Sequence, residues 1–366
     1  MNNPQRHILL RLLQNKGAVF GLIVISLSVV VAIGAYFIAP DDSPDANRMT
    51  VEIGGQKPGF RMQFLPVRLE GAMEGTGFWQ RLLYGRPDAF SWVPINSYEM
   101  KGDSVIVEKY VDEGVEERVG YPMSALRVNS APPSLADPFG VRERRFWLGT
   151  DKYGRDVLSR LLVGVRVSLS VGLVTVLISL TIGVFLGAVA GYFRGRVDGI
   201  IMWLINVIWS IPTLLLVFAI TLLLGKGFWQ IFIAIGLTMW VNVARIIRGQ
   251  VMEAREREYV EAARALGYSH ARILFHHILP NVMGPVLVVA ASNFASAIVI
   301  EAGLSFLGIG VQPPQPSWGL MIKENYNFII THNPMLALAP GFAIMLLVLA
   351  FNLLGNGLRD ALSVRV

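Results

Sequence analysis

The chain has 366 residues, of which 53% are hydrophobic and only 16% are charged. Soluble domains carry about 25% charged residues, so this balance indicates that much of the apolar surface faces lipid. The chain has no cysteine, which excludes disulfides and thiolate metal sites. We attribute the net charge of +6 to Lys and Arg gathered on one side of a membrane, and we expect no nucleic-acid partner.

The first apolar segment, residues 17–39, is uncharged and follows Arg6, Arg11 and Lys16. A membrane-spanning helix needs about 20 apolar residues. A cleaved signal peptide has a shorter apolar region and a small-residue cleavage site. We therefore expect residues 1–40 to form an N-terminal segment and an uncleaved first transmembrane helix.

Residues 41–147 differ in composition from the rest of the chain. They are rich in charged residues and contain turn signals such as Gly54-Gly55 and an alternating apolar run at residues 104–108. This pattern predicts strands, so we expect a small β-containing soluble insert after the first helix. Pro132-Pro133 predicts a linker back to the membrane.

Five more apolar segments follow, at residues 167–193, 199–225, 227–244, 281–300 and 334–358. Pro212, Pro285 and Pro340 lie within them and predict kinks or helix starts, because neighbouring helices satisfy the freed carbonyls. The sequence therefore predicts an all-α polytopic membrane protein with six transmembrane helices. The insert at 41–147 separates the first helix from a core at 148–366.

The distribution of Lys and Arg predicts the orientation of the spans. With the N-terminus in the cytoplasm, the cytoplasmic segments are residues 1–16, 194–198, 245–280 and the tail from 359. These segments are rich in Arg, whereas the short opposite loop at Lys226 has one cation. Long translocated domains count little toward this bias. Six spans with both termini in the cytoplasm fit this pattern.

The polar segment at residues 245–280 predicts two short helices. Glutamates and arginines alternate through its first half at spacings of three and four, which support a solvated helix. Val260, Ala263 and Leu266 recur at helical spacing and predict an apolar stripe. Gly267 predicts a helix stop, and Ser269 predicts the cap of a second helix that runs through Ile278. On charge and periodicity alone, the segment also fits a connecting loop with a solvated helical face.

The spacing within this segment resembles the EAA loop of ABC-transporter permeases, the cytoplasmic surface that docks onto an ATPase. The resemblance is carried by Glu261-Ala262-Ala263, then Gly267, then Leu279-Pro280. His277 stands where the family favours isoleucine. The resemblance implies ATPase contacts at Tyr259, Glu261, Ala262, Ala263, Leu266, Gly267, Leu279 and Pro280.

Four further segments resemble the permeases of dipeptide, oligopeptide and nickel importers, at residues 11–16, 148–160, 191–198 and 304–319. The first of them resembles the start of the C-type subunit. The long insert resembles the branch with an enlarged outer loop, such as the microcin C peptide importers.

This resemblance implies a bacterial cytoplasmic (inner) membrane protein with several partners. They are a second, similar permease, two ABC ATPase subunits, an extracytoplasmic solute-binding protein and membrane lipid. No cofactor and no covalent chemistry are expected of this chain. It lacks a phosphate-binding loop, so the ATPase must be another chain.

Four polar residues in or next to the segment 281–300 are candidates for the pathway or the subunit interface. Ser292, Asn293 and Ser296 either line the pathway or hold helices together by hydrogen bonds, and we favour the second role. Glu301 is either a pathway or interface residue, or a carboxylate near the membrane boundary or neutralised by burial.

Two other function classes compete with the permease. An ion-coupled secondary transporter would carry several paired intramembrane charges or a visible repeat, whereas only Glu301 and no clear repeat are found. A membrane-anchored enzyme that uses the insert would need a catalytic constellation. The sequence has neither the His-Glu-x-x-His nor the Gly-x-Ser-x-Gly pattern.

Overall fold

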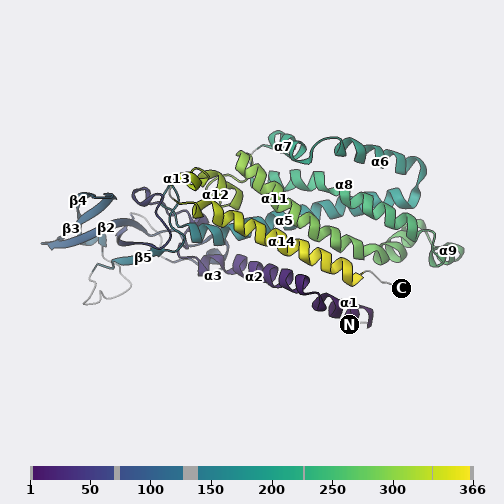
Figure 1. Cartoon of the computed structure of the whole chain (residues 1–366), viewed down its shortest axis with the longest axis horizontal. Coiled ribbons are helices and arrows are strands. Elements are labelled where there is room, and N and C mark those ends of the chain that lie inside the picture. Colours follow the sequence, from purple (N-terminus) through teal and green to yellow (C-terminus); the bar gives the residue numbers. More distant parts are fainter. Residues whose placement is uncertain (1–2, 70–74, 127–138, 226, 332, 363–366) are drawn as a thin grey trace. The chain divides into compact units, whose positions relative to one another are not determined.

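A computed structural model describes residues 3–69, 75–126, 139–225, 227–331 and 333–362. The chain divides into two compact units (Figure 1). The helical unit comprises Met1–Val29, Val167–Gln312 and Phe342–Val366, and the sheet unit comprises Val30–Arg166 and Pro313–Gly341. The predicted linker at Pro132-Pro133 lies outside the described residues.

Five helices among the described residues are long and apolar enough to cross a membrane, which confirms a polytopic α-helical protein. They are α2 (Lys16–Ile38), α5 (Val157–Phe193), α8 (Phe228–Ala254), the run His270–Leu307 that ends in α11 (Met283–Leu307), and α14 (Met335–Leu362). The short helix α1 (Asn3–Gln14) precedes them.

The segment predicted as one span at 199–225, with a kink or helix start at Pro212, contains two helices, α6 (Gly195–Trp209) and α7 (Thr213–Leu224), bent by 92°. Pro212 lies at the break, with a ψ of 126° that no α-helix adopts. Because its ring fixes φ and removes an N–H donor, the helix does not continue through it. The described chain therefore has five candidate spans, or six if this bent pair counts as one.

A ladder of glycines lets α5 lie directly against α8 in the helical unit. A Cβ added to Gly183, Gly187 or Gly191 would come within 2.7 Å of a backbone carbonyl oxygen of α8. This spacing of four residues is the small-xxx-small pattern by which membrane helices approach closely. Glycines at this spacing are visible in the sequence, although no helix contact was predicted from them.

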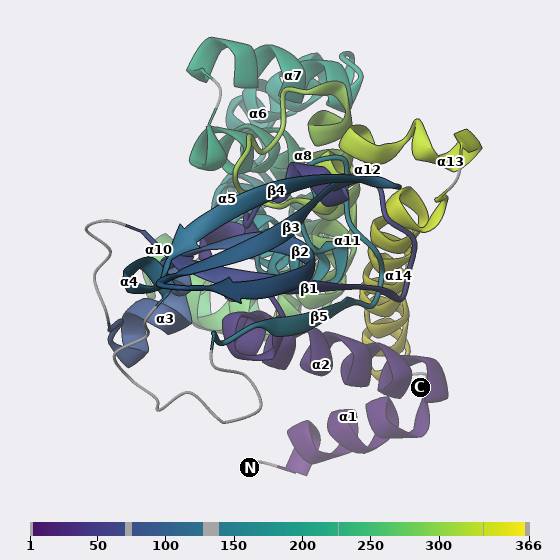
Figure 2. The ribbon, with the colours of Figure 1, turned by 90° about the vertical axis from the view of Figure 1, so that its left-hand side faces the viewer.

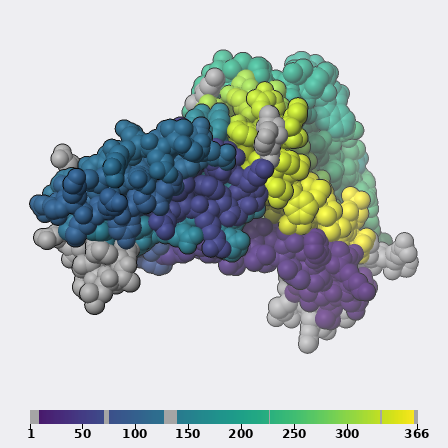
Figure 3. Space-filling view, turned by 60° about the vertical axis from the view of Figure 1, so that its left-hand side comes forward, coloured from purple at the N-terminus to yellow at the C-terminus, as the bar shows by residue number. Residues whose placement is uncertain are grey.

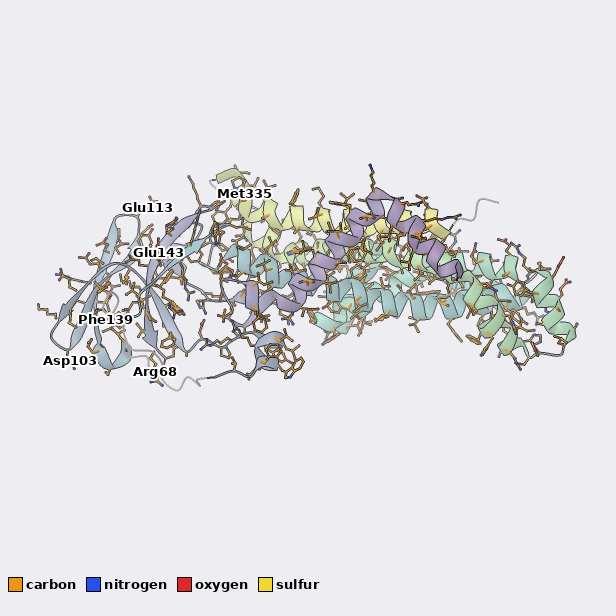
Figure 4. All side chains as sticks on the ribbon, turned by 90° about the horizontal axis from the view of Figure 1, so that it is seen from below. Arg68, Asp103, Glu113, Phe139, Glu143 and Met335 are labelled. Carbon is orange, nitrogen blue, oxygen red and sulfur yellow. The ribbon has the colours of Figure 1, made fainter. Side chains whose placement is uncertain are left out.

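The sheet unit contains a five-stranded antiparallel sheet in the order β4-β3-β2-β1-β5 (Figure 2). Its strands are β1 (Phe60–Arg68), β2 (Phe90–Lys101), β3 (Ser104–Asp112), β4 (Val115–Pro122) and β5 (Arg142–Phe146). The predicted strand at 104–108 is confirmed, with Val105 and Val107 buried in the core. Asp103 and Glu113 mark the turns at the two ends of β3 (Figure 4).

The strands and the segment that precedes α5 form one continuous body, whose strand residues appear in blue in Figure 3. Thr50 donates its backbone N–H to the Tyr153 carbonyl at 3.1 Å, and Gly55 donates to the Asp151 carbonyl at 2.9 Å. Thr150 in turn donates to the Gln56 carbonyl at 3.1 Å. The two ends of the sheet insert are therefore joined at its base.

Candidate ATPase-docking site and pathway residues

The polar segment after α8 folds as a short helix, a turn and a second helical stretch, as predicted. The first helix is α9 (Glu258–Ala265). The second begins with α10 (His270–Arg272), which Ser269 caps by accepting from the Arg272 N–H at 3.4 Å. It continues as the π-helical turn η3 (Ile273–Ile278) and the 3₁₀ turn η4 (Leu279–Val282) before α11. Pro280 explains the departure from regular α-helix in these turns, because its ring is incompatible with an α-helix interior.

Gly267 ends α9 in the way the sequence predicts. Its φ is +76°, its N–H donates to the Arg264 carbonyl at 2.9 Å, and the Tyr268 N–H donates to the Ala263 carbonyl at 3.1 Å. These two bonds and the left-handed glycine make a Schellman motif. A Cβ at Gly267 would meet no atom of the described chain within 4 Å. Glycine is therefore required here for its backbone conformation, and the surface beside it is open.

The predicted docking residues separate into an outward face and a packed inner side. We call the exposed residues Tyr259, Glu261, Ala262, Leu266 and Gly267 the docking face. Leu266 is 71% exposed although it belongs to the predicted apolar stripe. Its partners in that stripe, Val260 and Ala263, are buried at 0% and 4% exposure.

The inner side of α9 joins one apolar cluster with the neighbouring helices. Val260 and Ala263 pack in this cluster with residues of α8 and η3, and Val286 brings in α11. Leu279 is half-buried against the same cluster, whereas Pro280 is exposed. Ala263 and Leu279 therefore hold α9 on the bundle, and the docking face is presented to the outside.

Residues at the end of α5 and the start of α6 also hold this segment in place. Asp198 accepts both Nε and Nη2 of Arg248 at 2.5 and 2.6 Å. Arg255 Nη1 donates to the Tyr192 carbonyl at 2.6 Å, and Arg194 pairs with Glu256 at 2.6 Å. The sequence predicted residues 191–198 only as a family motif. In the structure, their contacts hold the end of α8 and the start of the polar segment that follows it, residues 255–280, which we call the docking segment.

Two histidines of the docking segment make aromatic contacts. His277, the residue that departs from the family pattern, stacks on Tyr268 with ring centroids 5.6 Å apart and planes 10° apart. Arg272 covers the same tyrosine, with its guanidinium carbon 4.3 Å from the ring centroid. His270 Nδ1 lies 2.9 Å from the Tyr192 hydroxyl. These contacts give both rings a packing role.

Of the candidate pathway residues, Asn293 is a helix-packing residue and Ser296 lines a cavity. Asn293 is 4% exposed and its Nδ2 lies 3.5 Å from Ser179 Oγ on α5. Ser296 shares a cavity of about 200 Å³ with Thr238 and Asn242 of α8 and with residues of α6 and α7. Ser292 is exposed on α11.

Glu301 is buried within the protein, at 1% exposure. Its Oε1 accepts the Ser305 hydroxyl at 2.6 Å, and Ser305 Oγ accepts the Val311 N–H at 3.0 Å. The carboxylate therefore helps to hold the turn that follows α11, where Gly308 adopts a φ of +86°. This geometry favours the structural alternative among the roles considered for Glu301.

Two family profiles match the chain. The profile described as "Binding-protein-dependent transport system inner membrane component" matches residues 183–366, which is half of the chain. The profile described as "N-terminal TM domain of oligopeptide transport permease C" matches residues 3–58.

Curated relatives agree with these profiles. The chain is 41% identical over 246 residues to the oligopeptide transport system permease protein OppC of Bacillus subtilis, covering 67% of this chain and 77% of that protein. It is 45% identical over 221 residues to the di/tripeptide transport system permease protein DppC of Pseudomonas aeruginosa, covering 60% and 73%. A solved inward-facing MetNI methionine ABC transporter covers 56% of this chain and 97% of its own, at 18% identity and a TM-score of 0.45.

The long match of the first profile and the extent of the relatives establish the family. The chain belongs to the inner-membrane components of binding-protein-dependent transport systems, as a C-type permease of the dipeptide and oligopeptide ABC transporter group.

Proposed function

We propose that this chain imports peptides or related small solutes and takes its energy from ATPase subunits that bind the docking face. The permease relatives are named for oligopeptides and di/tripeptides, which supports this substrate class. The chain forms the pathway with a second, similar permease, and a solute-binding protein delivers the substrate. The docking segment and both termini lie in the cytoplasm, and the chain itself performs no catalysis.

The observation that carries the proposal is the two-sided construction of α9. Its C-cap residue, Leu266, is apolar and 71% exposed, and its inner side is fixed in the cluster with α8 and α11. The same two helices supply Thr238, Asn242 and Ser296 to the cavity of about 200 Å³. A force on the docking face is therefore carried by packed helices to a cavity in the bundle.

This arrangement supports a two-state mechanism. Closure of the ATPases displaces α9 as a rigid lever, and α8 and α11 move with it because the apolar cluster does not deform continuously. The ion pair between Asp198 and Arg248 makes the start of α6 follow the same movement. The bundle then changes access from one side of the membrane to the other.

The test is the association of the ATPase with a variant of the exposed leucine. Burial of a leucine side chain contributes about 1.5–3 kcal/mol, and each 1.4 kcal/mol is about tenfold in affinity. Leu266→Ala is therefore expected to weaken co-purification of the ATPase by about ten- to a hundredfold. Val115→Ala, at a 53% exposed residue of β4, is the matched control and is expected to leave it unchanged. Equal ATPase recovery with Leu266→Ala and wild type would contradict the docking assignment.

A further inference from the structure

A short helix in the sheet unit exposes an unusually apolar surface. α3 (Phe78–Tyr84) has Phe78, Trp79, Leu83 and Tyr84 at 52–70% exposure, although it has only 7 residues. An aromatic cluster of this kind is typical of the membrane–water interface, where Trp and Tyr place their rings at the level of the lipid headgroups.

The position of α3 agrees with such an interface. Phe78 contacts Phe37 in the last turn of α2, with ring centroids 5.7 Å apart, and Arg81 lies over the same Phe37 ring at 4.8 Å. Because α2 is an uncharged candidate span between Gly17 and Ile38, its end marks a membrane surface. α3 therefore lies at the height where that span leaves the lipid.

A cationic pocket opens beside α3 and the end of α2. It has a volume of about 420 Å³ and includes Ala39 and Pro40, the residues that follow α2 closely. Its walls carry five arginines and two aspartates, namely Arg48, Arg81, Arg86, Arg142, Arg144, Asp42 and Asp88. The pocket therefore has an excess of positive charge next to the lipid boundary.

Much of this positive charge is not neutralised by the protein. Asp88 and Asp42 are engaged by Arg48 and Arg81. Within the described residues, neither Arg86 nor Arg142 has an ion pair, and the buried donors Trp92 Nε1 and Arg81 Nε have no hydrogen-bond partner. Burial, together with the nearby Arg48 cation, lowers the pKa of Arg144 to about 10. An anion with several acceptor oxygens would satisfy these donors.

We propose that this pocket binds the phosphate of an anionic phospholipid headgroup while the aromatic side chains of α3 enter the headgroup region of the same leaflet. Both features lie in the sheet unit, and both lie beside the end of α2. Lipid is favoured over a free phosphate as the source, because the pocket and the apolar helix are contiguous through Arg81, which belongs to both.

The experiment uses the purified full-length chain and native mass spectrometry with phosphatidylglycerol as the probe. The double variant Arg86→Gln/Arg142→Gln is expected to retain the lipid about tenfold less than wild type. Arg61→Gln/Arg118→Gln, at two exposed arginines of the same sheet, is the matched control and is expected to retain it fully. Inorganic phosphate and phosphatidylcholine are expected to compete poorly.

A second measurement locates α3. Brominated phosphatidylglycerol in vesicles is expected to quench a fluorescence component that is present in wild type and absent in Trp79→Phe. Equal lipid retention by the pocket variant and its control would overturn the proposal. So would competition by inorganic phosphate as strong as that by the lipid, which would indicate a free anion. An unquenched Trp79 would also overturn it and would indicate that α3 faces a protein partner.

Discussion

The close contact between α5 and α8 predicts that alanine in place of Gly187 destabilises the helical unit. A Cβ at this position would lie 2.4 Å from the Ala244 carbonyl oxygen and 2.9 Å from the Ala244 Cα. Both are backbone atoms, so no side-chain rotation relieves the overlap and the two helices must separate. Forced overpacking of this kind costs about 1–3 kcal/mol, and the helix propensity of alanine offsets at most about 1 kcal/mol of it. Gly187→Ala is therefore expected to lower the stability of the helical unit by about 1–2 kcal/mol.

A glycine on α8 serves as a control, because replacing it with alanine changes the helix propensity without creating a steric clash. Gly249 lies on α8, and a Cβ there would meet no atom within 4 Å of the described chain. Gly249→Ala is therefore expected to raise stability by about 0.5–1 kcal/mol. Thermal unfolding of both variants in the same detergent measures the difference. Equal or greater stability of Gly187→Ala relative to wild type would refute the close approach of α5 and α8.

Three further predictions concern other elements. Glu324→Ala removes one of the two carboxylates, Glu324 and Asp151, that pair with the buried Arg155 and Arg160. It is expected to cost about 3–5 kcal/mol in thermal unfolding, because two buried cations are then left to share one carboxylate; a loss below 1 kcal/mol would contradict the pairing. Gly267→Ala places alanine at a φ of +76° and is expected to cost about 1–2 kcal/mol locally, seen as faster amide exchange in α9; unchanged exchange would count against the Schellman turn. Although burial opposes it, the hydrogen bond from Lys109 holds the pKa of Glu52 below its usual 4.5. The stability that this ion pair contributes is therefore present above pH 4.5 and is lost as the pH falls below it. The loss of stability at acid pH should be less steep in Glu52→Gln, and identical pH profiles of the variant and wild type would refute a contribution from the Glu52–Lys109 pair.

Local patterns in the sequence predicted much of the helical architecture. Uncharged stretches of sufficient length located the spans, because lipid contact requires apolar residues continuously along a helix. Gly267 was predicted as a helix stop because a glycine stop depends mainly on the backbone conformation of the glycine itself. The strand at 104–108 was predicted for the same reason, since alternation is a local pattern.

Features that depend on distant residues were missed. The predicted second span began at residue 167, whereas α5 begins at Val157 and includes the buried Arg160. That arginine is accommodated by Asp151 and Glu324, and the second of these lies on α12 (Trp318–Asn325), far along the chain. The pairing of Asp198 with Arg248 was missed for the same reason. Charge patterns within one window do not reveal such partners.

The exposure of the docking residues could not be predicted from the sequence and is known only from the structure. Helical periodicity grouped Leu266 with Val260 and Ala263 as one apolar stripe, yet Leu266 lies past Ala265, the last residue of α9, and points away from the cluster. Its position at the C-cap explains the difference, because the chain turns at Gly267 immediately after it. The candidate docking face therefore depends on how the chain turns at the end of α9 and on the helices that pack against α9.

We infer that Leu266 lies against an ATPase subunit in the assembled transporter. Because the chain has no cysteine, Leu266→Cys carries a single thiol that accepts a maleimide-linked photoreactive benzophenone. Illumination of the assembled complex is expected to give a covalent adduct between this chain and the ATPase. The same label at Val115→Cys is expected to give none. Absence of an ATPase adduct from Leu266→Cys, in a complex that still contains the ATPase, would contradict the account.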